Sequence, residues 1–411
     1  MNLAVISVSA LALAVVISCF SRLNVGVLSV AMAWIVGVYL GGLPVNTVMA
    51  GFPSQLFLTL TGVTLLFAMA QSNGTLSRLA HHAVGACRGN AGTIPIMFFV
   101  LGALLSSMGP GNIATAALLT PIAMATAVRA GIPLFLMAIM VGNGANAGAL
   151  SPFAPTGIIV NGIMAKNQMA GLETSTYLYN LGAHALMAFG GYALFGGLKL
   201  FAADRSVAVV DPEAGQPFDR RQWTTLGVIA ALLVSVLAFG AHVGLAAFVA
   251  AVVLVAARAA DDGEAIKQMP WRVIVMVCGV TVLISLVERF QGIDLMVSLV
   301  ARLSTPESVT AVVALITGVV SVYSSTSGVV LPAFLPLVPG LAAQLPGASA
   351  TAIAMSMNIG GHLVDVSPLS TIGALCISSA GAGDTRKLFN QLLAWGLSMA
   401  VAGALLCYLL F

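Results

Sequence analysis

Long apolar runs, separated by short polar breaks, make up almost the whole chain. Runs of 16 to 24 apolar residues recur from one end to the other. About 20 such residues form a helix that crosses a bilayer, whereas a membrane strand shows about ten residues of alternating character. The pattern therefore predicts an all-α polytopic membrane protein.

The order of the runs predicts two similar halves, residues 1–200 and 222–411, joined by the polar stretch 201–221 as a cytoplasmic linker. Each half is expected to contain three spans, an amphipathic helix, a helical hairpin, an interrupted helix and a last span. The predicted segments are 3–20, 25–41, 54–71, 75–89, 93–128, 133–164 and 177–200, then 222–240, 243–258, 271–287, 292–303, 307–345, 349–380 and 388–411.

Both predicted hairpins are broken by small, helix-breaking residues, at 109–111 and at 324–328. The arms around the first break are short for a full span, which favours a re-entrant hairpin whose tip reaches mid-membrane. A shift of 215 residues places 109–112 on 324–327, and a shift of 216 places 151–152 on 367–368. These coincidences in equivalent elements indicate an internal repeat.

The placement of basic residues predicts the orientation. Each half is expected to cross the membrane five times beside its hairpin, and this odd number inverts the second repeat relative to the first. With both termini outside, 13 of the 16 Lys and Arg fall on the cytoplasmic side, and only Lys166, Arg289 and Arg302 fall outside. We expect an integral protein of a bacterial inner membrane, with both termini outside.

Composition narrows the function classes. The chain is 59% hydrophobic and 7% charged. Its net charge of +3 does not indicate a nucleic-acid partner, because the positive residues of such a chain first reflect the orientation of its spans in the membrane. No P-loop, Ser-His-Asp order or HExxH motif occurs, so an enzyme is not predicted and no organic cofactor is expected. The five cysteines lack metal-ligand spacing and are expected to be inert core residues: Cys19, Cys87, Cys278, Cys376 and Cys407.

Four polar interruptions, namely two hairpin tips and two unwound helices at 142–152 and 358–368, are predicted to converge near the bilayer midplane. Broken helices expose N–H groups at one end and carbonyls at the other, so they hold an anion beside a cation. Asn112 is expected to cap the second arm of the first hairpin, and Ser327 to play the equivalent part in the second half. The alternative is that Gly and Pro only kink buried helices.

No Lys or Arg falls inside these four motifs, which predicts a carboxylate held by hydroxyls, amides, helix ends and co-bound Na⁺. The residues expected to bind substrate are Gly111, Asn112, Thr115, Ser151, Pro152, Thr326, Ser327, Ser367 and Pro368. Two oxygen cages for Na⁺ are expected, one at Ser106, Ser107, Asn112, Asn143, Gly144 and Asn146, the other at Ser324, Ser325, Thr326, Asn358 and Gly360.

Asp365 is the one acid within these motifs, three residues after His362. An intramembrane carboxylate is a candidate cation ligand or proton carrier, and with His362 it forms a possible proton or cation site. The structural alternative is a carboxylate that caps the following half-helix or pairs with His362. His184 is expected to be a packing residue, and His81 and His82 are expected to be solvated at the interface.

Four stretches of the chain carry a resemblance to a known family: NVGVLSVAMAWIVGVYLGG, FPSQLFLTLTGVTLLFAMAQSNGTL, GPGNIATAALLTPIAM and GNGANAGALSPFAPTG. They resemble the MatC-type malonate/dicarboxylate carriers of the ion transporter superfamily, which includes the divalent anion/sodium symporters. In those symporters a Ser-Asn-Thr signature nine residues before a proline binds carboxylate and Na⁺. Asn112 keeps the asparagine before Pro121, whereas Ser327 stands in that place before Pro336.

The resemblance implies a homodimer in the lipid membrane, in which scaffold and elevator-like transport domains are each drawn from both repeats. The residues and the resemblance together predict a secondary active transporter that imports malonate or a similar small dicarboxylate by Na⁺ symport. The alternatives are an H⁺-coupled carrier using Asp365, a cation/proton antiporter or anion efflux protein on the same scaffold, and a membrane subunit that needs a soluble binding protein.

Overall fold

A computed structural model describes the chain except for residues 1, 22, 87, 202–205, 209–215 and 381–384. Most of the predicted linker 201–221 lies outside the described residues. So do Cys87 and two of the basic residues counted on the cytoplasmic side, Arg22 and Arg205.

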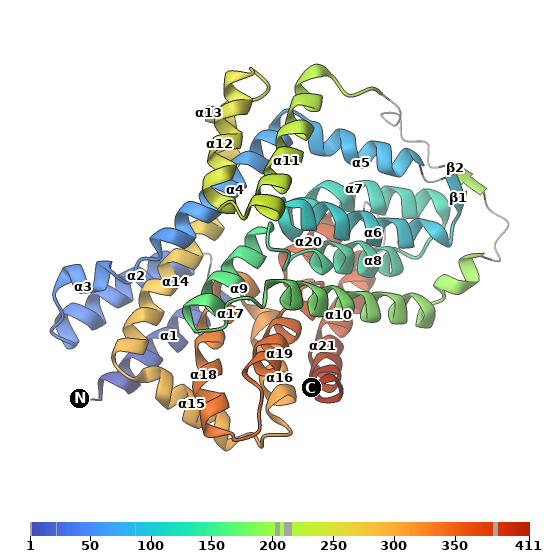
Figure 1. The fold of residues 1–411 in the computed structure, drawn as a ribbon. Helices are drawn as coiled ribbons and strands as arrows, with labels where there is room; N and C mark the ends of the chain where they lie inside the picture. Colours follow the sequence, from blue (N-terminus) through green and yellow to red (C-terminus); the bar gives the residue numbers. More distant parts are fainter. Residues whose placement is uncertain (1, 22, 87, 202–205, 209–215, 381–384) are drawn as a thin grey trace.

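The described chain is helical almost throughout, as predicted (Figure 1). The first half contains α1 (Leu3–Phe20), α2 (Val25–Trp34), η1 (Ile35–Leu40), α3 (Val45–Met49), α4 (Ser54–Ser72), α5 (Thr75–Ala86), β1 (Arg88–Asn90), α6 (Thr93–Met108), α7 (Gly111–Ala130), α8 (Leu134–Ala147), α9 (Pro155–Lys166), α10 (Glu173–Leu194), η2 (Gly197–Phe201) and β2 (Ser206–Ala208). The second half contains α11 (Arg220–Phe239), α12 (Val243–Ala256), α13 (Asp262–Gln268), α14 (Trp271–Arg289), α15 (Gly292–Arg302), α16 (Val309–Tyr323), η3 (Thr326–Val330), α17 (Leu331–Phe334), η4 (Leu335–Leu337), α18 (Val338–Gln344), α19 (Ala350–Leu363), α20 (Thr371–Ser378) and α21 (Thr385–Leu410).

Local signals set the helix ends. Asn24 caps α2 by accepting a hydrogen bond from the Gly26 amide, and Asp219 forms a capping box with Gln222 at the start of α11. Gly131 and Gly240 follow α7 and α11 in the left-handed conformation that glycine adopts without strain. These residues explain why the predicted bounds of most spans lie within two or three residues of the observed ones.

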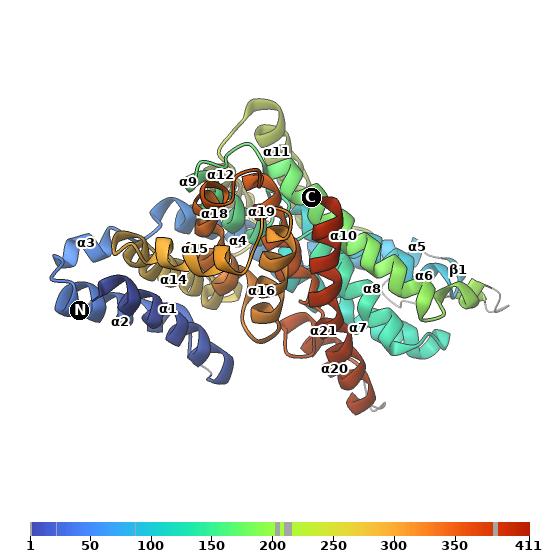
Figure 2. The same cartoon turned by 90° about the horizontal axis from the view of Figure 1, so that it is seen from below.

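The helices gather into two groups with a third set between them (Figures 1 and 2). Helices α1, α2, α14 and α15 pack together on one side, and α6, α7, α8 and α10 on the other. Helices α16, α19 and α21 pack against one another, and α19 also contacts α8 and α10. The short strands β1 and β2 pair antiparallel, with Gly89 opposite Val207, so part of the predicted linker is tied to the segment after α5.

Two glycines bring the broken helices directly onto the hairpins. A side chain at Gly144 in α8 would overlap the backbone of Phe99 in α6. Likewise, a side chain at Gly360 in α19 would overlap the backbone of Ala314 in α16. In a membrane the hydrophobic effect does not hold helices together, and van der Waals packing at small residues such as these glycines takes its place.

Six helical segments of the described chain are long and apolar enough to cross a membrane. They are Ser54–Ser72, Gly111–Ala130, Arg220–Phe239, Trp271–Arg289, Thr326–Gln344 and Thr385–Leu410. Shorter apolar helices accompany them, so the chain is an integral membrane protein. Two of the six are second arms of the predicted hairpins, and α7 with its 20 residues is about 30 Å long.

Candidate functional site

The first hairpin turns at Gly109 and Pro110, between α6 and α7. Gly109 has a φ of 140° and Gly111 a φ of 76°, which a residue with a side chain rarely adopts. A side chain at Gly109 would also overlap the ring of Phe67 in α4. The Gly-Pro-Gly sequence is therefore required both by the turn and by its packing against α4.

Asn112 is not the helix cap that the sequence predicts. Pro110 occupies the cap position of α7 without a side-chain hydrogen bond, and Asn112 lies in the first turn of the helix. Its Nδ2 donates to Oδ1 of Asn146 in α8 at 2.8 Å, and its side chain is nearly buried. Asn112 therefore joins the hairpin tip to the broken helix.

The first broken helix opens later than predicted. Helix α8 continues to Ala147, so Asn143, Gly144 and Asn146 are helical, and the break covers residues 148–154. In this break Ser151 Oγ donates to the carbonyl of Ser107 at the end of α6, at 2.7 Å. Residues 142–147 keep their helical hydrogen bonds instead of unwinding. This stretch is completely buried, and an unpaired backbone group is costly there.

The second hairpin turns at Ser324 and Ser325, between α16 and the π-helical turn η3. Ser325 caps this turn, because its Oγ accepts a hydrogen bond from the amide of Gly328 at 3.2 Å. The capping role predicted for Ser327 therefore falls to Ser325, and Ser327 lies inside the turn. A side chain at Gly328 would overlap Met276 in α14, which keeps this tip close to that helix.

The second broken helix is interrupted at residues 364–370, so Asn358, Gly360 and His362 are helical. Ser370 caps the following helix α20, and His362 Nδ1 lies 3.0 Å from the carbonyl of Asn358. Asp365 therefore neither caps α20 nor pairs with His362. Its carboxylate Oδ1 instead accepts a hydrogen bond from Thr326 Oγ1 at 2.7 Å, which joins the second tip to the second break.

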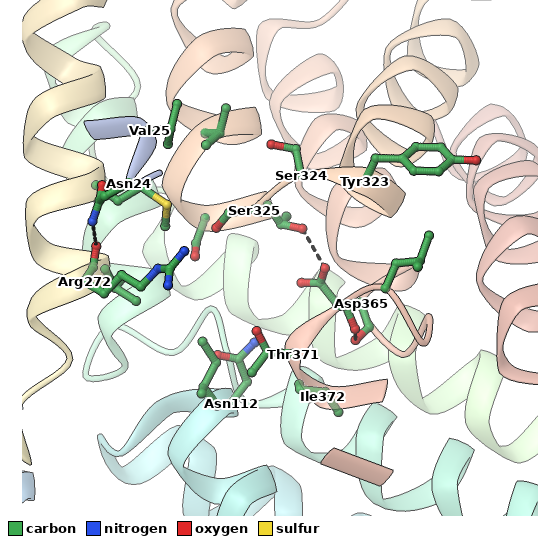
Figure 3. Close-up of a pocket in the computed structure, with 18 of the residues that line it drawn as sticks. Asn24, Val25, Asn112, Arg272, Tyr323, Ser324, Ser325, Asp365, Thr371 and Ile372 are labelled. Carbon is green, nitrogen blue, oxygen red and sulfur yellow. Dashed lines mark hydrogen bonds between the residues drawn. The ribbon is translucent and has the colours of Figure 1, made fainter. Parts of the chain in front are cut away.

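One polar cavity of about 420 Å³ lies where the two tips meet, and we refer to it as the central cavity (Figure 3). Asn112 comes from the first tip, Ser324 to Ser327 come from the second tip, and Asp365 comes from the second break. The polar side chains that line it are Ser21, Asn24, Asn112, Arg272, Tyr323, Ser324, Ser325, Thr326, Ser327, Asp365, Ser370 and Thr371. Three of the four predicted interruptions thus contribute directly to its wall.

Arg272, near the start of α14, is a cavity residue that the sequence reasoning missed. Its guanidinium points into the central cavity toward the space that Asp365 and Asn112 also face (Figure 3). Asn24 Nδ2 donates to the Arg272 carbonyl at 2.9 Å and so links its backbone to α2. The expectation of a carboxylate held without a salt bridge was drawn from the four motifs alone, and the structure places a basic side chain from outside those motifs at the cavity.

Among the residues predicted to bind substrate, Asn112, Thr326 and Ser327 line the central cavity and Gly111 lines a neighbouring one. The remaining residues line neither cavity: Thr115, Ser151, Pro152, Ser367 and Pro368. Thr115 and Ser367 are buried, so they would affect substrate binding only by holding neighbouring residues in place.

The two predicted oxygen cages are only partly assembled. Asn143 turns away from Asn112, with its Oδ1 2.9 Å from His184 Nδ1, and Ser107 Oγ donates to the Ala103 carbonyl at 2.6 Å. Ser106 Oγ is buried without a hydrogen-bond partner. Asn112 and Asn146 remain together in the first set.

In the second predicted cage, Thr326 Oγ1 approaches both Asp365 and the Gly361 carbonyl, at 2.7 and 3.2 Å. Asn358 lies apart, with Nδ2 3.8 Å from the sulfur of Met164. Ser324 and Ser325 line the central cavity, whereas Gly360 packs on α16. Across the described residues, no three His, Cys, Asp or Glu side chains are grouped to hold a metal ion.

The histidines occupy distinct environments. His184 is completely buried against Asn143. His82 contacts the Gln216 carbonyl at 2.8 Å through Nε2, and its ring stacks on Phe218 with centroids 4.8 Å apart. His82 is therefore held by the segment before α11, in addition to any solvent contact.

A partly open polar cavity bordered by broken helices, inside an apolar helical protein, is typical of membrane transport proteins. Residues 1–149 match the family model for the N-terminus of the dicarboxylate carrier protein MatC, which confirms the resemblance drawn from the sequence.

The fold is similar to the crystal structure of the YdaH transporter of Alcanivorax borkumensis, with a TM-score of 0.61 over 88% of this chain and 87% of that one. At 17% identity this likeness concerns the fold alone. No curated protein sequence matches the chain. The match to the dicarboxylate carrier model supports a membrane transporter.

Proposed function

We propose that the chain is a secondary active transporter that imports a small dicarboxylate, such as malonate, by Na⁺ symport. The observation that carries this proposal is the central cavity, where an arginine, an asparagine amide and an acid face one space within the protein. The match of residues 1–149 to the dicarboxylate carrier model supports the substrate class.

The cavity offers separate partners for each charge. The Arg272 guanidinium presents a planar set of donors that pairs with a carboxylate, and Asn112 adds an amide beside it. The Asp365 carboxylate, joined to Thr326, supplies negative charge and oxygen ligands for a cation. A dicarboxylate and Na⁺ would thus be held next to each other, so that each reduces the electrostatic cost of desolvating the other.

Inverted repeats, re-entrant hairpins and an elevator motion complete the proposal. The packing of Gly144 on Phe99 and of Gly360 on Ala314 supports the repeats, because the positions are related by 216 and 215 residues. Gly157 and Gly373, also 216 apart, each approach the carbonyl of a serine in the preceding break. Homodimerisation, a bacterial inner membrane and external termini belong to the same proposal.

Ligand stabilisation tests the substrate class. The purified protein is expected to unfold at a higher temperature with malonate or another C3 to C6 dicarboxylate, and more so when Na⁺ is present. Monocarboxylates of equal length serve as the control. Equal stabilisation by monocarboxylates and dicarboxylates would contradict the assignment.

Coupling to H⁺ is the second candidate, favoured by the position of Asp365 at the second tip. Under Na⁺ symport, Asp365→Asn removes a negative ligand, and we expect at least a tenfold higher Na⁺ concentration for half-maximal uptake. Uptake measured against Na⁺ at two pH values checks this. If the variant instead loses the pH dependence and keeps its response to Na⁺, the H⁺-coupled mechanism is supported.

A further inference from the structure

A second cavity of about 270 Å³ adjoins the central cavity, and we refer to it as the side cavity. We infer that the transported dicarboxylate carries an apolar substituent, and that this substituent occupies the side cavity while the carboxylates occupy the central one. The inference rests on the proposed function and specifies its substrate class.

The two cavities share part of their walls. Asn112, Ile113, Val273 and Ser327 line both of them. A ligand whose carboxylates lie against Arg272 and Asn112 therefore has the side cavity directly next to its carbon skeleton. A substituent on the carbon between two carboxylates would enter the side cavity past these four shared residues.

The lining of the side cavity favours an apolar group. Most of its lining surface is apolar and includes the Phe67 ring, Ala68, Ala117, Pro155 and Ile159. No charged side chain among the described residues lines it, and its polar side chains are those of Thr64, Gln71, Asn112, Thr156, Gln268 and Ser327. The hydroxyl of Thr64 is already used, since it donates to the Leu60 carbonyl at 2.7 Å. A carboxylate placed there would lose its hydration without gaining a charged partner.

Size gives an independent argument. Malonate has seven non-hydrogen atoms, and even at the roughly 30 Å³ that one water occupies in the liquid they fill only about 210 Å³. The central cavity alone has about 420 Å³ and the side cavity adds about 270 Å³. Even with Na⁺ beside it, malonate would leave part of this space unfilled, so the two cavities have room for a larger dicarboxylate.

Substituted malonates test the inference in proteoliposomes into which the full chain is reconstituted. Malonate, ethylmalonate, butylmalonate and benzylmalonate compete with labelled malonate for uptake. Each buried methylene is expected to improve the inhibition constant by about fourfold. Butylmalonate and benzylmalonate are therefore expected to inhibit at least tenfold better than malonate.

A variant that fills the side cavity can be compared with a matched control on the same helix. Ala117 is exposed on α7 and lines the side cavity, whereas Ala125 is exposed two turns later on α7 and lines neither cavity. Ala117→Phe is expected to remove the advantage of benzylmalonate and butylmalonate but to change malonate inhibition less than threefold. Ala125→Phe is expected to leave all four constants unchanged, and Ala117→Leu provides a smaller change if the Phe variant folds poorly.

The outcomes separate this inference from the proposed function. Malonate uptake that substituted malonates inhibit no better than malonate would overturn the inference and leave the transport proposal in place. Equal weakening of every ligand by Ala117→Phe would also overturn it. If no dicarboxylate competes in the unmodified protein, the proposed function fails as well.

Discussion

Replacing Asn112 with alanine is expected to lower dicarboxylate uptake roughly 10- to 150-fold while the protein remains folded in the membrane. Two effects add up in this variant. The substrate loses an amide donor, and a hydrogen bond to a charged group contributes about 1.5–3 kcal/mol. Asn146 also loses the partner that holds it to the first hairpin tip. Initial uptake rates at equal protein content in proteoliposomes measure the effect.

Asn167 provides the control for this variant. It ends α9, where its Nδ2 donates to the Ile163 carbonyl at 2.8 Å, away from both cavities. Asn167→Ala is expected to keep uptake within twofold of the unmodified protein. Uptake by Asn112→Ala within threefold of normal would show that the first tip does not bind substrate.

Replacing Arg272 with glutamine is expected to raise the KM for the dicarboxylate at least 30-fold, because a carboxylate in the central cavity then loses a charged, two-pronged donor. Arg272→Lys keeps the charge without the planar fork, so an intermediate increase is expected. Concentration dependence of uptake separates KM from maximal rate. Arg302→Gln, at an exposed position at the end of α15, is the control.

A result in which Arg272→Gln lowers only the maximal rate, with KM unchanged, would contradict direct binding. It would show that Arg272 supports the conformational change or the packing of α14 on α2 instead. The hydrogen bond from Asn24 to the Arg272 carbonyl involves the backbone and persists in all three variants. The comparison therefore isolates the side chain.

The helices could be predicted from the sequence because the apolar runs end at strong local signals. Pro53 and Pro270 precede α4 and α14, and the predicted starts 54 and 271 are the observed ones. The amphipathic segment predicted at 75–89 is helix α5, Thr75–Ala86. Such ends depend on residues within one turn, which a single sequence shows directly.

The details of the site depend on contacts between distant parts of the chain. The stretch 142–147 contains two glycines and two asparagines, which locally favour a break, yet it stays helical where Gly144 packs on the Phe99 backbone. Ser325 rather than Ser327 caps the second tip, because the chain turns two residues earlier than the repeat comparison suggests. Burial and packing override the local propensities here.

Arg272 could not be identified from the four motifs, since it lies 160 residues after Asn112 at the start of an ordinary span. A basic residue at such a position is usually explained by topology alone. Its role becomes visible only when α14 is placed beside the second tip. Asp365, by contrast, could be identified from the sequence as a candidate, but its partner Thr326 belongs to a different element and could not be predicted.

Uptake of labelled malonate into proteoliposomes, with and without an inward Na⁺ gradient at fixed pH, tests the central claim most directly. We expect accumulation above the external concentration only when the gradient is present, and loss of accumulation when choline replaces Na⁺. Uptake that is unchanged in choline would contradict Na⁺ symport, and the absence of uptake under every gradient would contradict dicarboxylate transport by this chain.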